Sequence, residues 1–225
     1  LERQAIQRKL CLYVRTPAHA RAAEILRDHN YCVLTGVPGV GKTTLGQVLV
    51  TSLLEEGYSL IAVRDDIQRA IDQLSATGRQ VIYYDDFLGT ASLGERLSKN
   101  EDKGIIRLIA SVAQSKNTKL ILTTRDYILE DAQRVYERLS GPELKLAKCT
   151  VQVQDFSRGH RARLLYNHLY FSSYPQECLD SLLAGRGYIK IIDHDNFNPR
   201  IIEHMTQGVE VHDHAPGQCL QRFIE

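Results

Sequence analysis

The chain has 225 residues, of which 43% are hydrophobic and 24% are charged, and its formal net charge at pH 7 is +1. This composition is typical of a globular domain, and it provides no overall basic field that would attract nucleic acid or a membrane surface. The sequence contains no apolar run that could span a bilayer and no signal peptide. Five widely spaced cysteines predict reduced, buried thiols in a cytoplasmic protein.

The N-terminal part predicts one helix, one strand and a glycine-rich loop. Residues 1–16 allow a short strand or an extended arm, because apolar and polar residues alternate near their end. The pair Thr16–Pro17 predicts a helix start, with a capping hydroxyl and proline at the first position. Residues 31–35 read as a buried strand, and residues 36–44 form the glycine-rich loop. The helix that follows this loop is expected to end at Gly57.

Further strands and helices alternate along the next hundred residues. We predict strands at 59–63, 81–86, 119–124 and 149–153, and helices at 67–74, 104–114 and 127–139. Such alternation predicts an α/β fold, with a parallel sheet sandwiched by helices. The near-continuous apolar character of the two middle strands agrees, because both faces of such strands are covered.

After residue 153 only helices are expected, at 157–170, 175–184 and 199–206. We therefore predict a nucleotide-binding core with an N-terminal arm at 1–155, followed by a small helical lid at 156–206. Residues 207–225 would begin a following region. The first residue is leucine and the last stretch is apolar, so we expect a fragment of a longer protein.

Within residues 36–44, positions 36–43 match the phosphate-binding pattern G-x-x-x-x-G-K-[ST] without a mismatch, and Thr44 follows. The glycines let successive backbone N–H groups point at phosphate oxygens, and the following helix adds its positive N-terminal end. Lys42 can reach the β- and γ-phosphates, and the Thr43 hydroxyl can bind Mg²⁺. The nucleotide-binding residues predicted here are Gly36, Pro38, Gly39, Val40, Gly41, Lys42, Thr43 and Thr44.

Asp85 and Asp86 close the apolar strand 81–86. Open α/β sheets bind ligands at the carboxyl ends of their strands. A carboxylate at such an end, in a chain with a P-loop, is the expected partner of Mg²⁺. We assign Asp85 to the metal, through water, together with Thr43, and we predict that Asp86 orients or activates the attacking water. The alternative is that one of the acids only caps the strand.

Thr123, Thr124 and Arg125 end the strand 119–124. The hydroxyls can hydrogen-bond to the γ-phosphate or to the attacking water, and the guanidinium can pair with phosphate oxygens bidentately. We therefore predict Thr124 and Arg125 as catalytic residues, beside Asp86 and Lys42. The alternative for Arg125 is a surface arginine that merely follows a strand.

Asn198, Pro199 and Arg200 open the last predicted helix. Proline suits the first helical position, so a plain helix start explains the three residues. The alternative is that Arg200 reaches the phosphates while Pro199 packs on the adenine. His194, just upstream, is assigned to a loop.

Two further features carry weaker signals. Arg158, Arg161 and Arg163 form a short basic run, which we interpret as a solvated helix face. The alternative is a contact with phosphate or with a partner. His212 and His214 lack the clustered ligands that a zinc site would need, so we interpret them as loop residues.

Taken together, these motifs resemble the STAND class of P-loop NTPases, whose core is similar to those of NACHT, NB-ARC and AAA+ proteins. The P-loop is followed in order by D-D-F-L-G at 85–89, T-T-R at 123–125 and N-P-R at 198–200. The set is most similar to the bacterial branch called novel STAND NTPase 3, over about residues 14–206.

The resemblance implies a five-stranded sheet of order 5-1-4-3-2, and an arm with Val14, Arg15 and Thr16 that touches the base. It also implies a switch that binds ATP or ADP with Mg²⁺, hydrolyses ATP slowly and self-associates when ATP replaces ADP. An effector and a sensor domain would lie elsewhere in the full-length chain, with a role in bacterial antiphage defence or signalling. Many relatives have a winged-helix domain after the lid, and residues 207–225 could be only its beginning.

Three other functions stay open. An AAA+-type motor or loader acting on nucleic acid or protein would need an arginine finger in trans, for which Arg125, Arg134 and Arg138 are candidates. The near-neutral charge offers it no nucleic-acid track. A small-molecule kinase would need an arginine-rich lid, and the late N-P-R motif argues against it. A nucleotide-binding module without hydrolysis is the remaining alternative.

Overall fold

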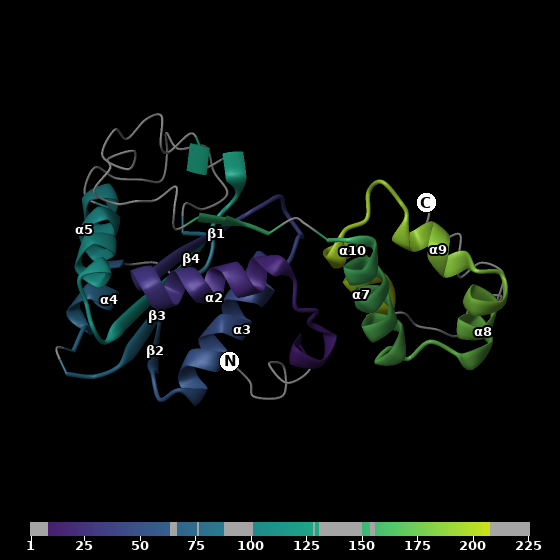
Figure 1. Ribbon diagram of the computed structural model, residues 1–225, viewed down its shortest axis with the longest axis horizontal. Coiled ribbons are helices and arrows are strands. Elements are labelled where there is room, and N and C mark those ends of the chain that lie inside the picture. Colours follow the sequence, from purple (N-terminus) through teal and green to yellow (C-terminus); the bar gives the residue numbers. More distant parts are fainter. Residues whose placement is uncertain are drawn as a thin grey trace. The chain divides into compact units, whose positions relative to one another are not determined.

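The computed structural model describes residues 9–63, 67–75, 77–87, 101–127, 129–130, 150–153 and 156–207 (Figure 1). The α/β part contains α2 (Pro17–His29), β1 (Tyr31–Thr35), α3 (Lys42–Glu55), β2 (Ser59–Val63), α4 (Ile67–Asp72), β3 (Gln80–Tyr84), α5 (Glu101–Ala113), β4 (Thr118–Thr123) and β5 (Thr150–Gln152). The helices that follow are α7 (Arg158–Tyr170), α8 (Gln176–Ala184), α9 (Gly187–Ile192) and α10 (Pro199–Thr206).

The five strands form one parallel sheet in the order β2-β3-β4-β1-β5. This confirms the predicted α/β fold and the predicted strand order 5-1-4-3-2, which is the same order listed from the opposite edge of the sheet. The contacting helix pairs α2–α3 and α4–α5 flank the sheet. The central strands explain the continuous apolar sequence, because all five residues of β1 are buried and Leu120, Ile121 and Leu122 of β4 have no exposed surface.

The chain divides into two units, which we describe separately. The core unit consists of Pro17–Pro38 and Lys42–Gln154, and the helical unit of Leu1–Thr16, Gly39–Gly41 and Asp155–Glu225. The helical unit has its own apolar core, formed by Val14, Leu164, Leu165, Leu182, Ile191, Ile192 and Ile202. The arm residue Val14 is thus buried among lid residues. The predicted boundaries of core, lid and following region stay predictions.

Three sequence predictions need correction. Residues 9–12 form a helical turn, closed by the hydrogen bond from the Tyr13 N–H to the Lys9 carbonyl, so the predicted strand or extended arm is wrong there. Strand β3 ends at Tyr84, and residues 85–87 form a turn. Helix α9 was not predicted, because six residues beginning with glycine are too short to show a helical period.

The cysteines also differ from expectation, since Cys178 is disulfide-bonded while Cys11 and Cys32 are free. The sequence spacing alone does not show which side chains meet in the fold. Within the described residues, no helix is long and apolar enough to cross a membrane. The predictions for Arg134, Arg138, His212, His214 and residues 208–225 lie outside the described residues, as does most of the predicted helix 127–139.

Candidate functional site

The P-loop joins β1 to α3, as the sequence predicts. Gly39 and Gly41 have φ angles of 82° and 95°, a left-handed conformation that side chains other than glycine rarely adopt. The Lys42 ammonium group lies over the loop and donates hydrogen bonds to the carbonyls of Gly36 at 2.9 Å and Val37 at 3.0 Å. The loop therefore holds its lysine at the start of α3, where a bound phosphate would lie.

The electrostatic surroundings of Lys42 identify the groups that share its site. Burial lowers the pKa of Lys42, whereas the carboxylates of Asp126, Asp86 and Asp85 raise it and the Arg125 guanidinium lowers it. These charged residues come from the carboxyl ends of β3 and β4, as the sequence predicts for Asp85, Asp86 and Arg125. Asp126 was not predicted, although it directly follows the T-T-R motif.

Asp85 lies at the centre of a polar network. Its Oδ1 accepts hydrogen bonds from the hydroxyls of Thr123 at 2.6 Å, Tyr83 at 2.9 Å and Thr43 at 3.1 Å. Its Oδ2 accepts one, from the Thr43 hydroxyl at 3.2 Å. Three donors thus fix one carboxylate oxygen, while the residue itself stays exposed and can offer the other oxygen to a ligand.

This arrangement fits the magnesium site predicted from the sequence. A hydroxyl and a carboxylate are hard oxygen ligands, and Mg²⁺ typically takes one or two such protein groups together with phosphate and water. Within the described part of the chain, no cluster of three or more His, Cys, Asp or Glu side chains could hold a metal ion alone. Thr43 and Asp85 are the residues that would hold a magnesium ion bound together with a nucleotide.

The next residue, Asp86, has a left-handed backbone with a φ angle of 50°. Aspartate tolerates this conformation better than most residues, at a modest energetic cost. The Thr123 hydroxyl accepts the Asp86 N–H at 2.8 Å, and the Thr123 carbonyl accepts the Phe87 N–H at 3.0 Å. Strand β4 thereby holds the turn in which Asp86 lies, beside the carboxylate predicted to bind the metal.

Thr124 and Asp126, after β4, carry buried oxygens with unmet hydrogen-bonding capacity. Thr124 has no exposed surface, and neither its Oγ1 nor Asp126 Oδ1 has a hydrogen-bond partner among the described residues. Such atoms are rare in folded proteins and call for an explanation, of which a ligand is one. Asp126 acts electrostatically on Lys42. The Thr124 hydroxyl can donate to a phosphate oxygen, whereas the Asp126 carboxylate oxygen can only accept, for example from a bound water.

Arg125 and Tyr127 follow the same strand. The Arg125 guanidinium donates a hydrogen bond to the Tyr127 hydroxyl at 2.9 Å, and this contact raises the Arg125 pKa. The arginine is half-buried, and its charge acts on Lys42. Its placement agrees with a phosphate-reading role, which stays a prediction.

The predicted residues outside the core unit are placed by their own contacts. Pro199 occupies the first turn of α10, and the Asn198 side chain caps this helix by accepting the Arg200 N–H at 2.9 Å. The Arg200 N–H also contacts the carbonyl of Gly39, at 3.2 Å within the helical unit. The Arg200 side chain is exposed, as is Arg15, while Thr16 is half-buried just before α2. Thr44 lies half-buried in the first turn of α3.

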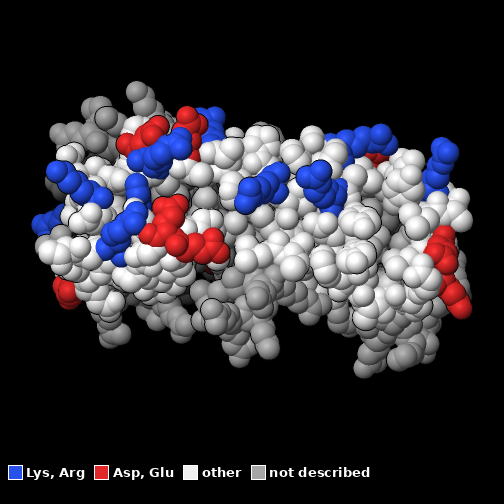
Figure 2. Space-filling model, turned by 60° about the horizontal axis from the view of Figure 1, so that its bottom comes forward, with Lys and Arg blue, Asp and Glu red and all other residues white. Residues whose placement is uncertain are grey.

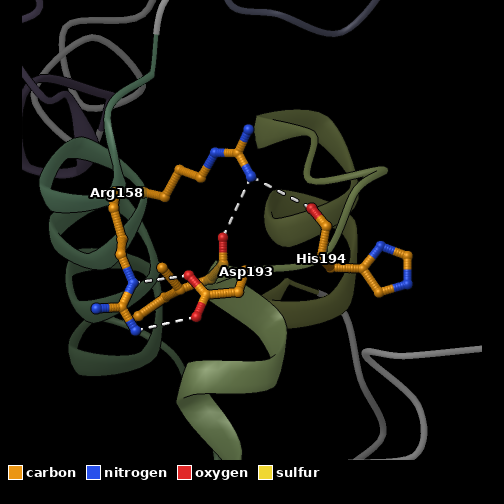
Figure 3. A network of polar contacts seen from close by, with 5 residues as sticks. Arg158, Asp193 and His194 are labelled. Atoms are coloured by element: carbon orange, nitrogen blue, oxygen red, sulfur yellow. Dashed lines mark hydrogen bonds and ion pairs between the residues drawn. The ribbon is translucent and has the colours of Figure 1, made fainter.

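Two arginines of the basic run on α7 make polar contacts with residues at the end of α9 (Figure 3). Arg158 forms a bidentate ion pair with Asp193, at 2.7 and 2.9 Å. Arg161 donates hydrogen bonds to the carbonyls of Ile192 and His194, both at 3.3 Å. These bonds satisfy carbonyl groups at the C-terminal end of α9. Arg158 and Arg163 are exposed, as predicted for a solvated face, whereas Arg161 is half-buried in these contacts. His194 lies in a loop, as predicted.

Tyr83 was not among the predicted site residues, and Thr123 was not predicted to contact Asp85, although both hydroxyls donate to its carboxylate. A signal for Tyr83 was available, because residues two apart on a strand share a face, and Tyr83 lies two positions before Asp85. A buried tyrosine hydroxyl also needs a partner. Burial and the neighbouring Asp85 carboxylate raise the pKa of Tyr83, so it remains a protonated donor at neutral pH.

The fold and this site define a P-loop nucleotide-binding domain. Comparison with known sequences specifies it further, because residues 13–171 match the family described as novel STAND NTPase 3. The chain belongs to this family of STAND-type P-loop NTPases. No curated protein sequence matches it.

Solved structures share the fold at low sequence identity. Domain III of the Thermotoga maritima replication initiation protein DnaA is 13% identical with a TM-score of 0.59, and the match covers 95% of each chain. The FIGL-1 AAA domain, solved with ADP, is 13% identical with a TM-score of 0.53, over 87% of this chain and 70% of that chain. The P216G mutant of Thermotoga maritima RuvB is 15% identical with a TM-score of 0.52, over 90% of this chain. The chain spans 60% of the RuvB length.

Proposed function

We propose that this domain is a slow ATPase that works as a regulatory switch, with the bound nucleotide setting its state. The observation that carries the proposal is the junction of the P-loop with β3. There Thr43 donates to both carboxylate oxygens of Asp85, at 3.1 and 3.2 Å, one residue after Lys42. Membership of the STAND-type family supports a switch in preference to a motor.

The proposed roles follow from the position of each group. Lys42 and the P-loop N–H groups bind the β- and γ-phosphates, and Thr43 and Asp85 hold the magnesium ion. That ion would neutralise phosphate charge when it is bound. Asp86 orients the attacking water, while Thr124 and Arg125 contact the γ-phosphate. Arg200, Pro199, Arg15 and Thr16 are proposed as further nucleotide contacts.

The proposal extends to the full-length protein. Exchange of ADP for ATP would favour self-association and activate an effector domain elsewhere in the chain, in bacterial antiphage defence or signalling in the cytoplasm. Nucleic acid is not the proposed partner. On the face shown in Figure 2, acidic and basic side chains are interspersed over the core unit, without a continuous basic track among the described residues.

Mass spectrometry of the nucleotide released from the purified protein tests the switch. We expect ADP to be carried through purification, and we expect sedimentation to show larger species with a non-hydrolysable ATP analogue than with ADP. An empty site and rapid ATP hydrolysis by the monomer would contradict the switch and favour an AAA+-type motor or loader.

A further inference from the structure

Tyr83 places a buried hydroxyl between the two elements that would hold the magnesium ion. Its side chain is 7% exposed, and its hydroxyl lies 2.9 Å from Asp85 Oδ1 and 3.4 Å from the carbonyl of Thr43. A phenol has one hydrogen to donate, and the shorter distance assigns it to Asp85. The ring thus connects the end of β3 to the first turn of α3.

Gly46 makes room for this ring. A Cβ atom on Gly46 would lie 2.7 Å from Tyr83 Cε2, 3.1 Å from its hydroxyl oxygen and 3.2 Å from Cζ. Glycine inside a helix costs about 1 kcal/mol relative to alanine. In α3 this cost coincides with a close contact between the tyrosine ring and the helix, so we attribute the glycine to this contact.

The contact has a consequence for Asp85. Its Oδ1 accepts hydrogen bonds from Tyr83 and Thr123 on the sheet side and from Thr43 on the helix side, whereas its Oδ2 accepts only from Thr43. Loss of one donor would let the exposed carboxylate turn. Groups that orient metal-binding side chains in this way often change metal affinity strongly when they are replaced.

We propose that Tyr83, seated against Gly46, is a positioning residue that orients the Asp85 carboxylate toward the magnesium–nucleotide complex. This inference rests on the proposed function, because it assumes that Asp85 serves a nucleotide-bound metal. It identifies a role for a tyrosine of β3 that lies outside the P-loop motif.

The test is nucleotide binding, measured with a fluorescent ADP analogue at increasing Mg²⁺ concentration and in EDTA. Tyr83→Phe keeps the ring and removes the hydroxyl. We expect its affinity in EDTA to equal that of the wild type, while the Mg²⁺ concentration needed for half of the affinity gain rises about tenfold. Tyr58→Phe is the matched control, because Tyr58 is also buried, at 8% exposure, and precedes β2 at the opposite end of its strand.

Gly46→Ala provides an independent arm. It should displace the ring and raise the Mg²⁺ requirement to a similar extent, and the double variant Gly46→Ala/Tyr83→Phe should add little to either single change. If Tyr83→Phe does not fold, Gly46→Ala carries the test alone. A wild-type Mg²⁺ requirement in the folded variants would overturn the inference and leave the proposed function intact. A wild-type chain whose nucleotide binding ignores Mg²⁺ would overturn both.

Discussion

Polar side chains are used differently in the two units. In the core unit they gather at the carboxyl ends of β1, β3 and β4, around Asp85, and buried oxygens of Thr124 and Asp126 have no partner among the described residues. In the helical unit, Arg158 pairs with Asp193, and the buried His168 lies 3.2 Å from the Thr206 hydroxyl. Buried oxygens without a described partner call for an explanation such as a ligand, whereas the exposed Arg158–Asp193 ion pair and the buried His168 contact are internal to the helical unit.

The largest expected effect is at Lys42. Lys42→Ala removes the ammonium group at the start of α3 and should abolish detectable ATP binding, because the phosphates lose their main cationic partner. Isothermal titration with ATP and Mg²⁺ measures this loss. Lys116→Ala, which changes an exposed lysine of the same unit, should bind like the wild type. If Lys42→Ala retained wild-type affinity for ATP, residues 36–44 would not be the phosphate-binding loop.

Asp86 should affect turnover but not binding. Asp86→Asn keeps the size of the side chain and removes its charge, so it should lower the ATP hydrolysis rate by about a hundredfold, as is typical for loss of a general base. Steady-state phosphate release measures the rate, and titration with ATP should show wild-type affinity. An unchanged hydrolysis rate would exclude Asp86 as the residue that activates water.

Thr123 and Thr124 allow a direct comparison between a hydroxyl that has hydrogen-bond partners in the fold and a hydroxyl that has none among the described residues. Thr124→Val removes a buried hydroxyl without a described partner, so it should leave the free energy of unfolding unchanged or raise it by about 1 kcal/mol. ATP turnover should fall about tenfold, if the hydroxyl contacts the γ-phosphate or the water. Thr123→Val removes a hydroxyl with two hydrogen bonds and should destabilise the fold by about 1–3 kcal/mol. If urea unfolding showed the same loss of stability in Thr123→Val and in Thr124→Val, the two hydroxyls would not differ in their contribution to the fold.

The smallest effect concerns the helical unit and pH. Burial lowers the pKa of His168 below its ordinary value of 6.5, and this outweighs the opposing effect of the Glu203 carboxylate. The unfolded chain therefore binds a proton at a higher pH than the folded chain. Stability should be complete above pH 6.5 and should fall as the pH drops toward the lower folded pKa, with a slope of about one proton at most.

His168→Asn should flatten that slope in urea unfolding measured from pH 7 downward. His204→Asn, at an exposed histidine of the same unit, is the control variant. ATP affinity at neutral pH should not change in either variant. A slope in His168→Asn as steep as that of the wild type, or steeper, would contradict the assignment of this histidine as a neutral structural group.

Local sequence signals predicted most elements of the fold. The prediction for β1 was correct at both ends, because an apolar run is followed directly by the P-loop glycines. Helix α7 was placed within one residue, since Ser157 caps it as expected. The order of the strands in the sheet could be predicted only from the resemblance to a known family. The alternation of strands and helices predicts a parallel sheet, but it does not show which strands lie next to one another.

Only those residues of the candidate site that belong to a sequence motif could be predicted from the sequence. Lys42, Thr43 and Asp85 follow from the P-loop and from a strand that ends in acid. The contact of Tyr83 with Gly46 joins residues 37 positions apart, and no local pattern reports which ring faces which glycine. Similarly, no local pattern shows that the Thr123 hydroxyl has two described partners while the Thr124 hydroxyl has none.

The magnesium site at Asp85 is tested most directly by the effect of Mg²⁺ on ATP affinity in Asp85→Asn, measured by titration calorimetry with Mg²⁺ and with EDTA. We expect Mg²⁺ to tighten binding about tenfold or more in the wild type and not in Asp85→Asn, with equal affinities in EDTA. The same Mg²⁺-dependent gain in Asp85→Asn would contradict the claim that this corner of the core unit binds a magnesium–nucleotide complex.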